Sequence, residues 1–140
     1  MVQTDRKLMP KARPRPVYRN IGVTDLARYR LPAPGIASIL HRVTGVGLFV
    51  GMLVILPLLQ MSLKSEAGFE AFRAVVWGNP VAKLVLIALL FATVYHLLAG
   101  VRHMIQDANR WLDLPTSINT ARAVILLSAA VTAIIAARVW

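Results

Sequence analysis

Three long stretches without a charged side chain constrain this chain more than any other feature. They cover residues 43–63, 84–101 and 123–137. A helix needs about 20 mainly apolar residues to cross the hydrocarbon core of a membrane. Snorkelling Lys83 and Arg102 extend the second stretch to that length, and the third reaches it by running past Arg138 to Trp140. The pattern predicts an all-α membrane protein with three transmembrane helices, at about residues 36–63, 80–105 and 117–140.

A water-soluble helical bundle is the alternative to a membrane protein. Because 57% of the residues are hydrophobic, three uncharged stretches of this length would leave little polar surface to face water. We therefore expect the membrane fold. Gly45, Gly47 and Gly51 fall within the first stretch, and they predict that another helix approaches closely on at least part of one face.

The basic residues predict how the chain is organised. Residues 1–34 form a basic, proline-bearing N-terminal segment, and residues 35–140 form the three-helix transmembrane domain. Nine of the sixteen Lys and Arg residues precede residue 43. Because cytoplasmic flanks are enriched in Lys and Arg, we expect a multi-pass membrane protein with a cytoplasmic N-terminus. Residues 64–83 then form an outer loop, and residues 102–122 form an inner loop.

Composition disfavours several classes of function. The net charge of +10 is not accompanied by a nucleic-acid-binding motif, and a basic tail beside a membrane helix typically contacts anionic lipid. The sequence has no cysteine, so it offers no disulfide, no thiolate chemistry and no ligand for an iron–sulfur cluster. No ionisable side chain lies at the middle of a predicted span, which disfavours a transporter or proton channel.

Two polar clusters lie where the first predicted helix begins and the second ends. Ser38, His41 and Arg42 open the first helix, and His96 and His103 lie near the end of the second. The predicted topology places both clusters in the inner leaflet. An imidazole at hydrocarbon depth either bonds a polar group on a neighbouring helix or ligates a metal, and it is a usual axial ligand of haem iron. The residues alone leave both interpretations of His96 open.

Helical spacing relates the members of each cluster. His96 and His103 are about two turns apart and share a face with Gly100, which leaves room for a flat group or another backbone. Ser38 and Arg42 share a face of the first helix and can act on one ligand. The His41 side chain points about 100° away from that of Arg42.

Each of these residues also has an ordinary interpretation. Ser38 suits a helix cap, and Arg42 suits an interfacial anchor. Arg102 and His103 are expected to face solvent or lipid, and Tyr95 is expected to pack against other helices.

Two segments of the chain resemble a known family. Residues 38–45 (SILHRVTG) and residues 96–104 (HLLAGVRHM), followed by Asp107, resemble the two signature segments of the cytochrome b556 anchor subunits of succinate dehydrogenase, complex II. The resemblance extends from about Pro16 to the end of the chain. It implies one part of a heterodimeric membrane-anchor bundle, in an oxidoreductase whose catalytic head lies in other subunits. Such a chain helps to pass electrons from succinate to quinone.

The resemblance also implies roles for the clustered residues. His96 is then the axial ligand of the iron of haem b, and the opposite ligand comes from a second anchor subunit. Ser38 and Arg42 match ubiquinone-binding positions, and His41 and Arg42 match positions near the haem propionates. His103 matches a neighbour of the haem edge. The implied partners are a flavoprotein subunit, an iron–sulfur subunit, the second membrane anchor and membrane lipid.

The chemistry of quinone reduction suits these residues. Reduction adds two electrons and two protons, and a fixed cation beside a carbonyl oxygen stabilises the developing negative charge in a dry site. Arg42 stays protonated there, and Ser38 can donate a hydrogen bond to the same oxygen. The alternative function is a purely structural anchor, which docks a soluble enzyme through its basic face and has no haem or quinone role.

Overall fold

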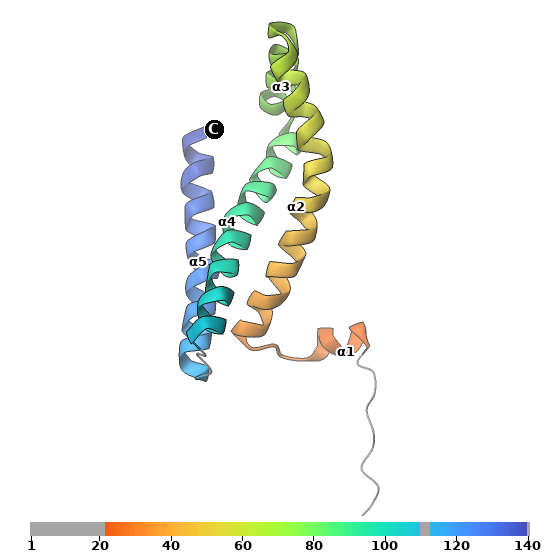
Figure 1. Cartoon of the computed structure of the whole chain (residues 1–140). Helices are drawn as coiled ribbons and strands as arrows, with labels where there is room; N and C mark the ends of the chain where they lie inside the picture. The colour runs from red at the N-terminus through yellow and green to blue at the C-terminus, as the bar shows by residue number, and fades with distance from the viewer. Residues whose placement is uncertain (1–21, 110–112, 140) are drawn as a thin grey trace, which may run out of the picture. The chain divides into compact units, whose positions relative to one another are not determined.

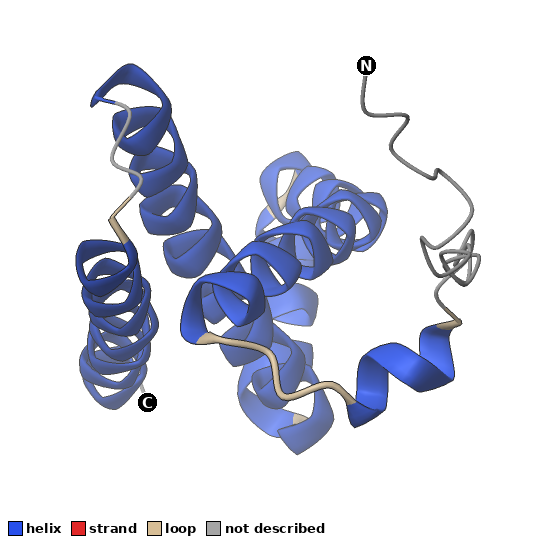
Figure 2. Ribbon diagram, turned by 90° about the horizontal axis from the view of Figure 1, so that it is seen from below, coloured by secondary structure: helices blue, strands red, loops and turns tan. Residues whose placement is uncertain are grey.

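The computed structural model describes residues 22–109 and 113–139, and within these ranges every regular element is a helix (Figures 1 and 2). In chain order the helices are α1 (Val23–Arg28), α2 (Ala33–Lys64), α3 (Glu66–Gly78), α4 (Pro80–Asn109) and α5 (Leu114–Val139). Residues 1–30 and 31–140 form two separate units. The first unit contains the short helix α1, and the second contains the other four. The predicted all-α fold is confirmed.

Three helices of the second unit are long and apolar enough to cross a membrane. They are α2 with 32 residues, α4 with 30 and α5 with 26, which confirms the three predicted spans. Helix α5 begins at Leu114, earlier than predicted, because the carboxylate of Asp113 accepts a hydrogen bond from the Thr116 N–H at 2.9 Å. Hydrogen bonds from the Thr116 side chain and backbone hold the pKa of Asp113 below its ordinary value. The predicted end of this helix, Trp140, lies outside the described residues.

Helix α3 occupies most of the segment that was predicted to be an outer loop. It begins at a side-chain cap, in which the Ser65 hydroxyl accepts a hydrogen bond from the Gly68 N–H at 3.1 Å. Phe72 and Val76 are four residues apart and lie on one face, toward α2 and α4. Figure 1 shows α3 returning alongside the far end of α2. The uncharged stretches could not predict this helix, because it is amphipathic and carries charges on its other face.

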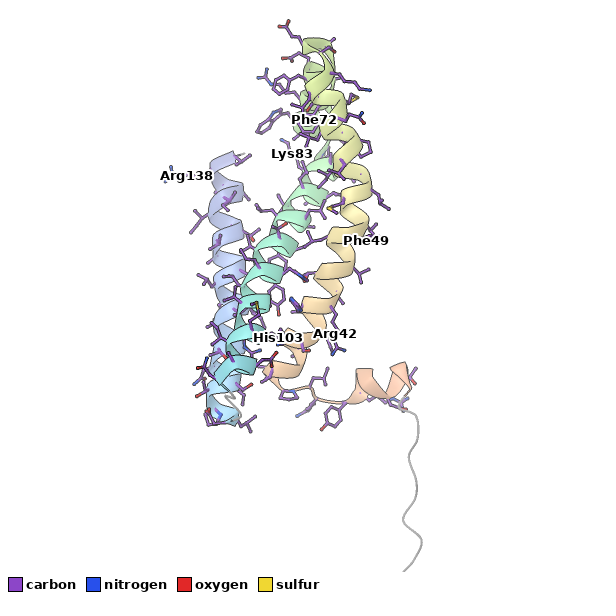
Figure 3. The ribbon with its side chains drawn as sticks, in the orientation of Figure 1. Arg42, Phe49, Phe72, Lys83, His103 and Arg138 are labelled. Carbon is purple, nitrogen blue, oxygen red and sulfur yellow. The ribbon has the colours of Figure 1, made fainter. Side chains whose placement is uncertain are left out.

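The three spans pack largely through small side chains, and many of their large apolar side chains are exposed. The buried small residues are Ala37, Thr44 and Gly51 of α2, Ala92 and Ala99 of α4, and Ala121, Ser128 and Thr132 of α5. Small residues let membrane helices approach closely. In contrast, Phe49 and Leu53 are each 67% exposed, and Figure 3 shows Phe49 pointing away from α4. Such a surface suits lipid tails or partner helices rather than water.

Two of the three glycines in the first span lie where α4 approaches α2. A Cβ atom at Gly51 would lie 2.6 Å from Cδ2 of Leu89, and one at Gly45 would lie 2.9 Å from Cε1 of His96. A Cβ atom at Gly47 would meet nothing within 4 Å. The predicted close approach on part of one helix face is therefore confirmed at Gly45 and Gly51.

Arg102 joins α4 to α5, so the expectation that it faces solvent or lipid was wrong. The residue is buried. Its guanidinium donates hydrogen bonds to Oγ1 of Thr120 at 3.1 Å, to the Ser117 carbonyl at 2.9 Å and to Oγ of Ser117 at 3.2 Å. The first turns of α5 thus supply three oxygen acceptors, which replace water around the charged group.

Replacing Arg102 by leucine is expected to weaken the packing of α4 against α5. The change removes the guanidinium together with its three hydrogen bonds to α5. The free energy of unfolding should therefore fall by about 1–2 kcal/mol. Unfolding of the chain in detergent micelles measures the loss. The matched control is Arg122→Leu, at an exposed arginine of α5. Equal stability of the two variants would mean that the Arg102 contacts contribute nothing to the packing.

Candidate functional site at the histidine cluster

The three described histidines lie together between α2 and α4. The His41 ring of α2 stacks on the His96 ring of α4, with ring centroids 4.1 Å apart and an angle of 14° between the planes. The same ring lies 5.2 Å from the His103 ring at an angle of 58°. Gly100 permits this approach, because a Cβ atom there would lie 3.4 Å from Nε2 of His41. We call His41, His96 and His103 the histidine cluster.

The His96 imidazole is held by one of its two nitrogens. Nδ1 lies 3.0 Å from the carbonyl oxygen of His41 and 3.3 Å from Oγ1 of Thr44. Because a carbonyl oxygen can only accept, Nδ1 must carry the proton and donate it to that oxygen. Nε2 has no hydrogen-bond partner in the part of the chain that the structure describes, and it is not among the buried polar atoms. An accessible lone pair at Nε2 is what a metal ligand requires.

Tyr95 contributes more than the packing expected from the sequence. It is fully buried, and its hydroxyl donates a hydrogen bond to the Ala37 carbonyl at 2.8 Å. This contact ties the first turns of α2 to the residue next to His96. Sequence reasoning could not assign this partner, because the acceptor is a backbone carbonyl that leaves no signal in the side-chain pattern.

Ser38 and Arg42 do not join the histidine cluster. Ser38 is half-buried, and its hydroxyl makes no hydrogen bond to the residues that the structure describes. Arg42 is exposed, and Figure 3 shows it on the side of α2 that faces away from α4. The two residues lie one turn apart, and residues 31–109 and 113–139 leave Arg42 exposed.

The histidine cluster does not form a metal site on its own. Its rings stack face to face or tilt instead of converging on a point. In residues 22–109 and 113–139, no group of three His, Cys, Asp or Glu side chains is placed to hold a metal ion. Among these rings, His96 is the one whose Nδ1 lies at hydrogen-bond distance from a carbonyl oxygen, which leaves the lone pair on Nε2. Such a nitrogen suits a group whose metal takes a further ligand from elsewhere.

A large apolar cavity lies away from the histidine cluster. Its volume is about 600 Å³, and it lies between α2, α3 and α4, with Val54, Phe72 and Leu86 among its lining residues. No titratable side chain lines it. The cavity lacks the groups that proton or electron chemistry needs, so the histidine cluster is the stronger candidate for a functional site.

Comparison with known proteins places the chain among membrane subunits of one kind of complex. The family described as "Succinate dehydrogenase/Fumarate reductase transmembrane subunit" matches residues 11–135. A succinate dehydrogenase cytochrome b556 subunit of Coxiella burnetii is 34% identical over 116 residues, which cover 83% of this chain and 91% of the relative. Its counterpart in Paracoccus denitrificans is 34% identical over 97 residues, covering 69% of this chain and 74% of the relative. The mitochondrial cytochrome b560 subunit of Sus scrofa is 28% identical over 101 residues, covering 71% and 60%.

Proposed function

From the premise that this chain belongs to the succinate dehydrogenase/fumarate reductase transmembrane subunit family, we propose that it binds haem b jointly with a second membrane anchor. We further propose that it contributes to the site at which complex II reduces ubiquinone. The observation that carries the haem proposal is the state of His96, whose Nδ1 is bonded to the His41 carbonyl and whose Nε2 is accessible. The cytochrome b names of the relatives agree with this choice of cofactor.

Nε2 of His96 would hold the iron of haem b, because imidazole is a usual protein ligand of haem iron. The second membrane anchor would supply a further protein ligand. When bound, haem b supplies a one-electron carrier; this chain's part is to hold the ring of His96 and to balance the charge of the propionates. His41 and His103 are the titratable groups of the histidine cluster that match that second role, whereas Arg42 faces away from α4.

Ser38 and Arg42 suit the quinone head. In this arrangement the hydroxyl of Ser38 donates a hydrogen bond to a quinone carbonyl, and the guanidinium of Arg42 stabilises negative charge on the same oxygen as electrons arrive. Because Arg42 is exposed, we propose that partner subunits complete the quinone pocket. Helix α2 contains no Asp or Glu, and its titratable group next to Arg42 is His41, so we propose that partner subunits and water deliver the protons.

The electrons enter from outside this chain. The sequence has no cysteine, so it cannot hold the iron–sulfur clusters that relay electrons toward the membrane. A flavoprotein subunit and an iron–sulfur subunit supply them. The excess of Lys and Arg before residue 43 favours a cytoplasmic N-terminus in the bacterial inner membrane, which places Ser38, Arg42 and the histidine cluster on the side where the soluble subunits dock.

Purification of the whole complex tests this function directly. The complex is extracted in mild detergent through a tag on this chain, its subunits are identified, and its reduced-minus-oxidised absorption spectrum is recorded. We expect a flavoprotein, an iron–sulfur subunit and a second anchor, together with the bands of a b-type haem. The same subunits without b-type bands would favour the purely structural anchor.

A further inference from the structure

We propose that Thr44 and Gly45 of α2 are positioning residues that fix the orientation and the tautomer of the His96 imidazole. We call this pair the Thr44–Gly45 seat. The inference rests on the proposed function of His96 as a haem ligand. It adds that the geometry of this ligand is set from the neighbouring helix, by a hydroxyl and by the absence of a side chain.

Gly45 provides the space in which the imidazole lies. A Cβ atom at this residue would lie 2.9 Å from Cε1 of His96, closer than two such atoms normally pack, and 3.4 Å from Nδ1, at contact distance. The ring cannot easily rotate away, because its face is stacked on His41 with centroids 4.1 Å apart. A methyl group at residue 45 therefore has to displace either the ring or α4 itself.

Thr44 provides a second oxygen for the bound nitrogen. Its side chain is buried, and its hydroxyl lies 2.8 Å from the Leu40 carbonyl and 3.0 Å from the His41 carbonyl. The single hydroxyl proton is donated to one of these carbonyls, so a lone pair remains for Nδ1 of His96 at 3.3 Å. The Nδ1 proton thus faces two acceptors, the His41 carbonyl and the Thr44 hydroxyl.

These contacts affect the nitrogen on the other side of the ring. With the proton fixed on Nδ1, the lone pair of a neutral imidazole stays on Nε2, where a metal can use it. Acceptors at Nδ1–H also make the imidazole a more basic ligand, and removal of such partners typically costs about 10- to 100-fold in metal affinity. The Thr44–Gly45 seat therefore sets both the position and the donor strength of Nε2.

The first test compares two glycine substitutions in α2 in the purified complex. Gly45→Ala should lower the haem-to-protein ratio, with haem retention weakened about tenfold or more. Gly47→Ala introduces the same methyl group two residues away, where nothing lies within 4 Å, and should retain haem as the unaltered complex does. Equal haem content in the two variants, whether high or low, overturns the role of Gly45.

The second test changes only the hydroxyl, so it applies even if Gly45→Ala fails to assemble. Thr44→Val keeps the shape of the side chain and removes the oxygen, and Thr44→Ser keeps the oxygen. A less basic imidazole favours reduced iron, so Thr44→Val should raise the midpoint potential of the haem and shift its low-spin electron paramagnetic resonance signal. Thr44→Ser should leave both near their original values. An unchanged potential and signal in Thr44→Val overturns the role of Thr44.

The outcomes separate this inference from the function on which it rests. If His96→Ala retains its haem, the proposed ligand is wrong and the Thr44–Gly45 seat has no role. If His96→Ala loses its haem while Gly45→Ala and Thr44→Val match the unaltered complex, His96 is the ligand and the seat alone is refuted.

Discussion

Replacing His96 by alanine should remove haem b from the assembled complex. The His41 carbonyl holds Nδ1 of His96, so the lone pair of the ring stays on Nε2, where a metal can use it. Removing a hydrogen-bond partner of a metal ligand lowers metal affinity by about tenfold or more, and removing the ligand itself should lower it further. The haem-to-protein ratio should therefore fall by more than about tenfold. The measurement is the pyridine haemochrome content of the purified complex, with each subunit quantified alongside.

His103→Ala is the matched control for this prediction. His103 lies on the same helix, and its ring also approaches His41, at 5.2 Å. Because His103 is proposed as a neighbour of the haem edge and not as a ligand, the His103→Ala complex should retain most of its haem. A His96→Ala complex with a full complement of haem and an unaltered spectrum would contradict the ligand assignment. So would loss of haem from His103→Ala alone.

The topology of the three spans could be predicted from the sequence, because the membrane interior requires long uncharged segments whose backbone polar groups are hydrogen-bonded internally. Uncharged stretches of sufficient length have few alternatives to spanning helices, and antiparallel spans bring the start of α2 and the end of α4 to the same level. That reasoning places His41 and His96 in the same leaflet, but it does not indicate which side chains of the two helices meet. Helical spacing then indicates that Gly100 lies on the face of His96, where the structure shows the His41 ring.

The hydrogen-bond partners that side chains find on other helices could not be predicted from the sequence. Arg102 was expected at a solvent or lipid surface because its position in the chain is interfacial, and nothing local indicates that Ser117 and Thr120 provide acceptors. Thr44 likewise reads as an ordinary span residue until its distance to His96 is known. Helix α3 was missed for a different reason, since its charged residues, Glu66, Glu70 and Arg73, hide it from a search for uncharged stretches.

The positions of Ser38 and Arg42 mean that this chain supplies only part of the proposed quinone site. Spacing alone gives them a common face, and in residues 31–109 and 113–139 the structure leaves Arg42 exposed and Ser38 half-buried. A dry pocket cannot form on one exposed helix surface, so any quinone chemistry there depends on a second protein surface. The consequence is that loss of Arg42 should affect electron transfer to quinone and leave the catalytic head intact.

Replacing Arg42 by leucine should therefore abolish most quinone reduction while succinate oxidation continues. The variant loses a fixed cation at the oxygen that becomes negative, and removal of one such group typically lowers turnover by about 100- to 1000-fold. Electron transfer from succinate to a soluble dye does not use this site and should remain near its original rate. The rate of quinone reduction by Arg42→Lys should lie between that of Arg42→Leu and that of the unaltered complex. An ammonium keeps the charge but lacks the forked donor geometry of the guanidinium.

The ratio of the two activities is what distinguishes a quinone site from an assembly defect. Arg30→Leu removes an exposed arginine just before α2 and should leave the ratio of quinone to dye reduction unchanged. Equal loss of both activities in Arg42→Leu would mean that Arg42 serves docking of the soluble subunits. An unchanged ratio with full activity would place the quinone elsewhere. Ser38→Ala provides an independent check, because loss of one neutral hydrogen bond should raise the KM for quinone several-fold and leave dye reduction unaffected.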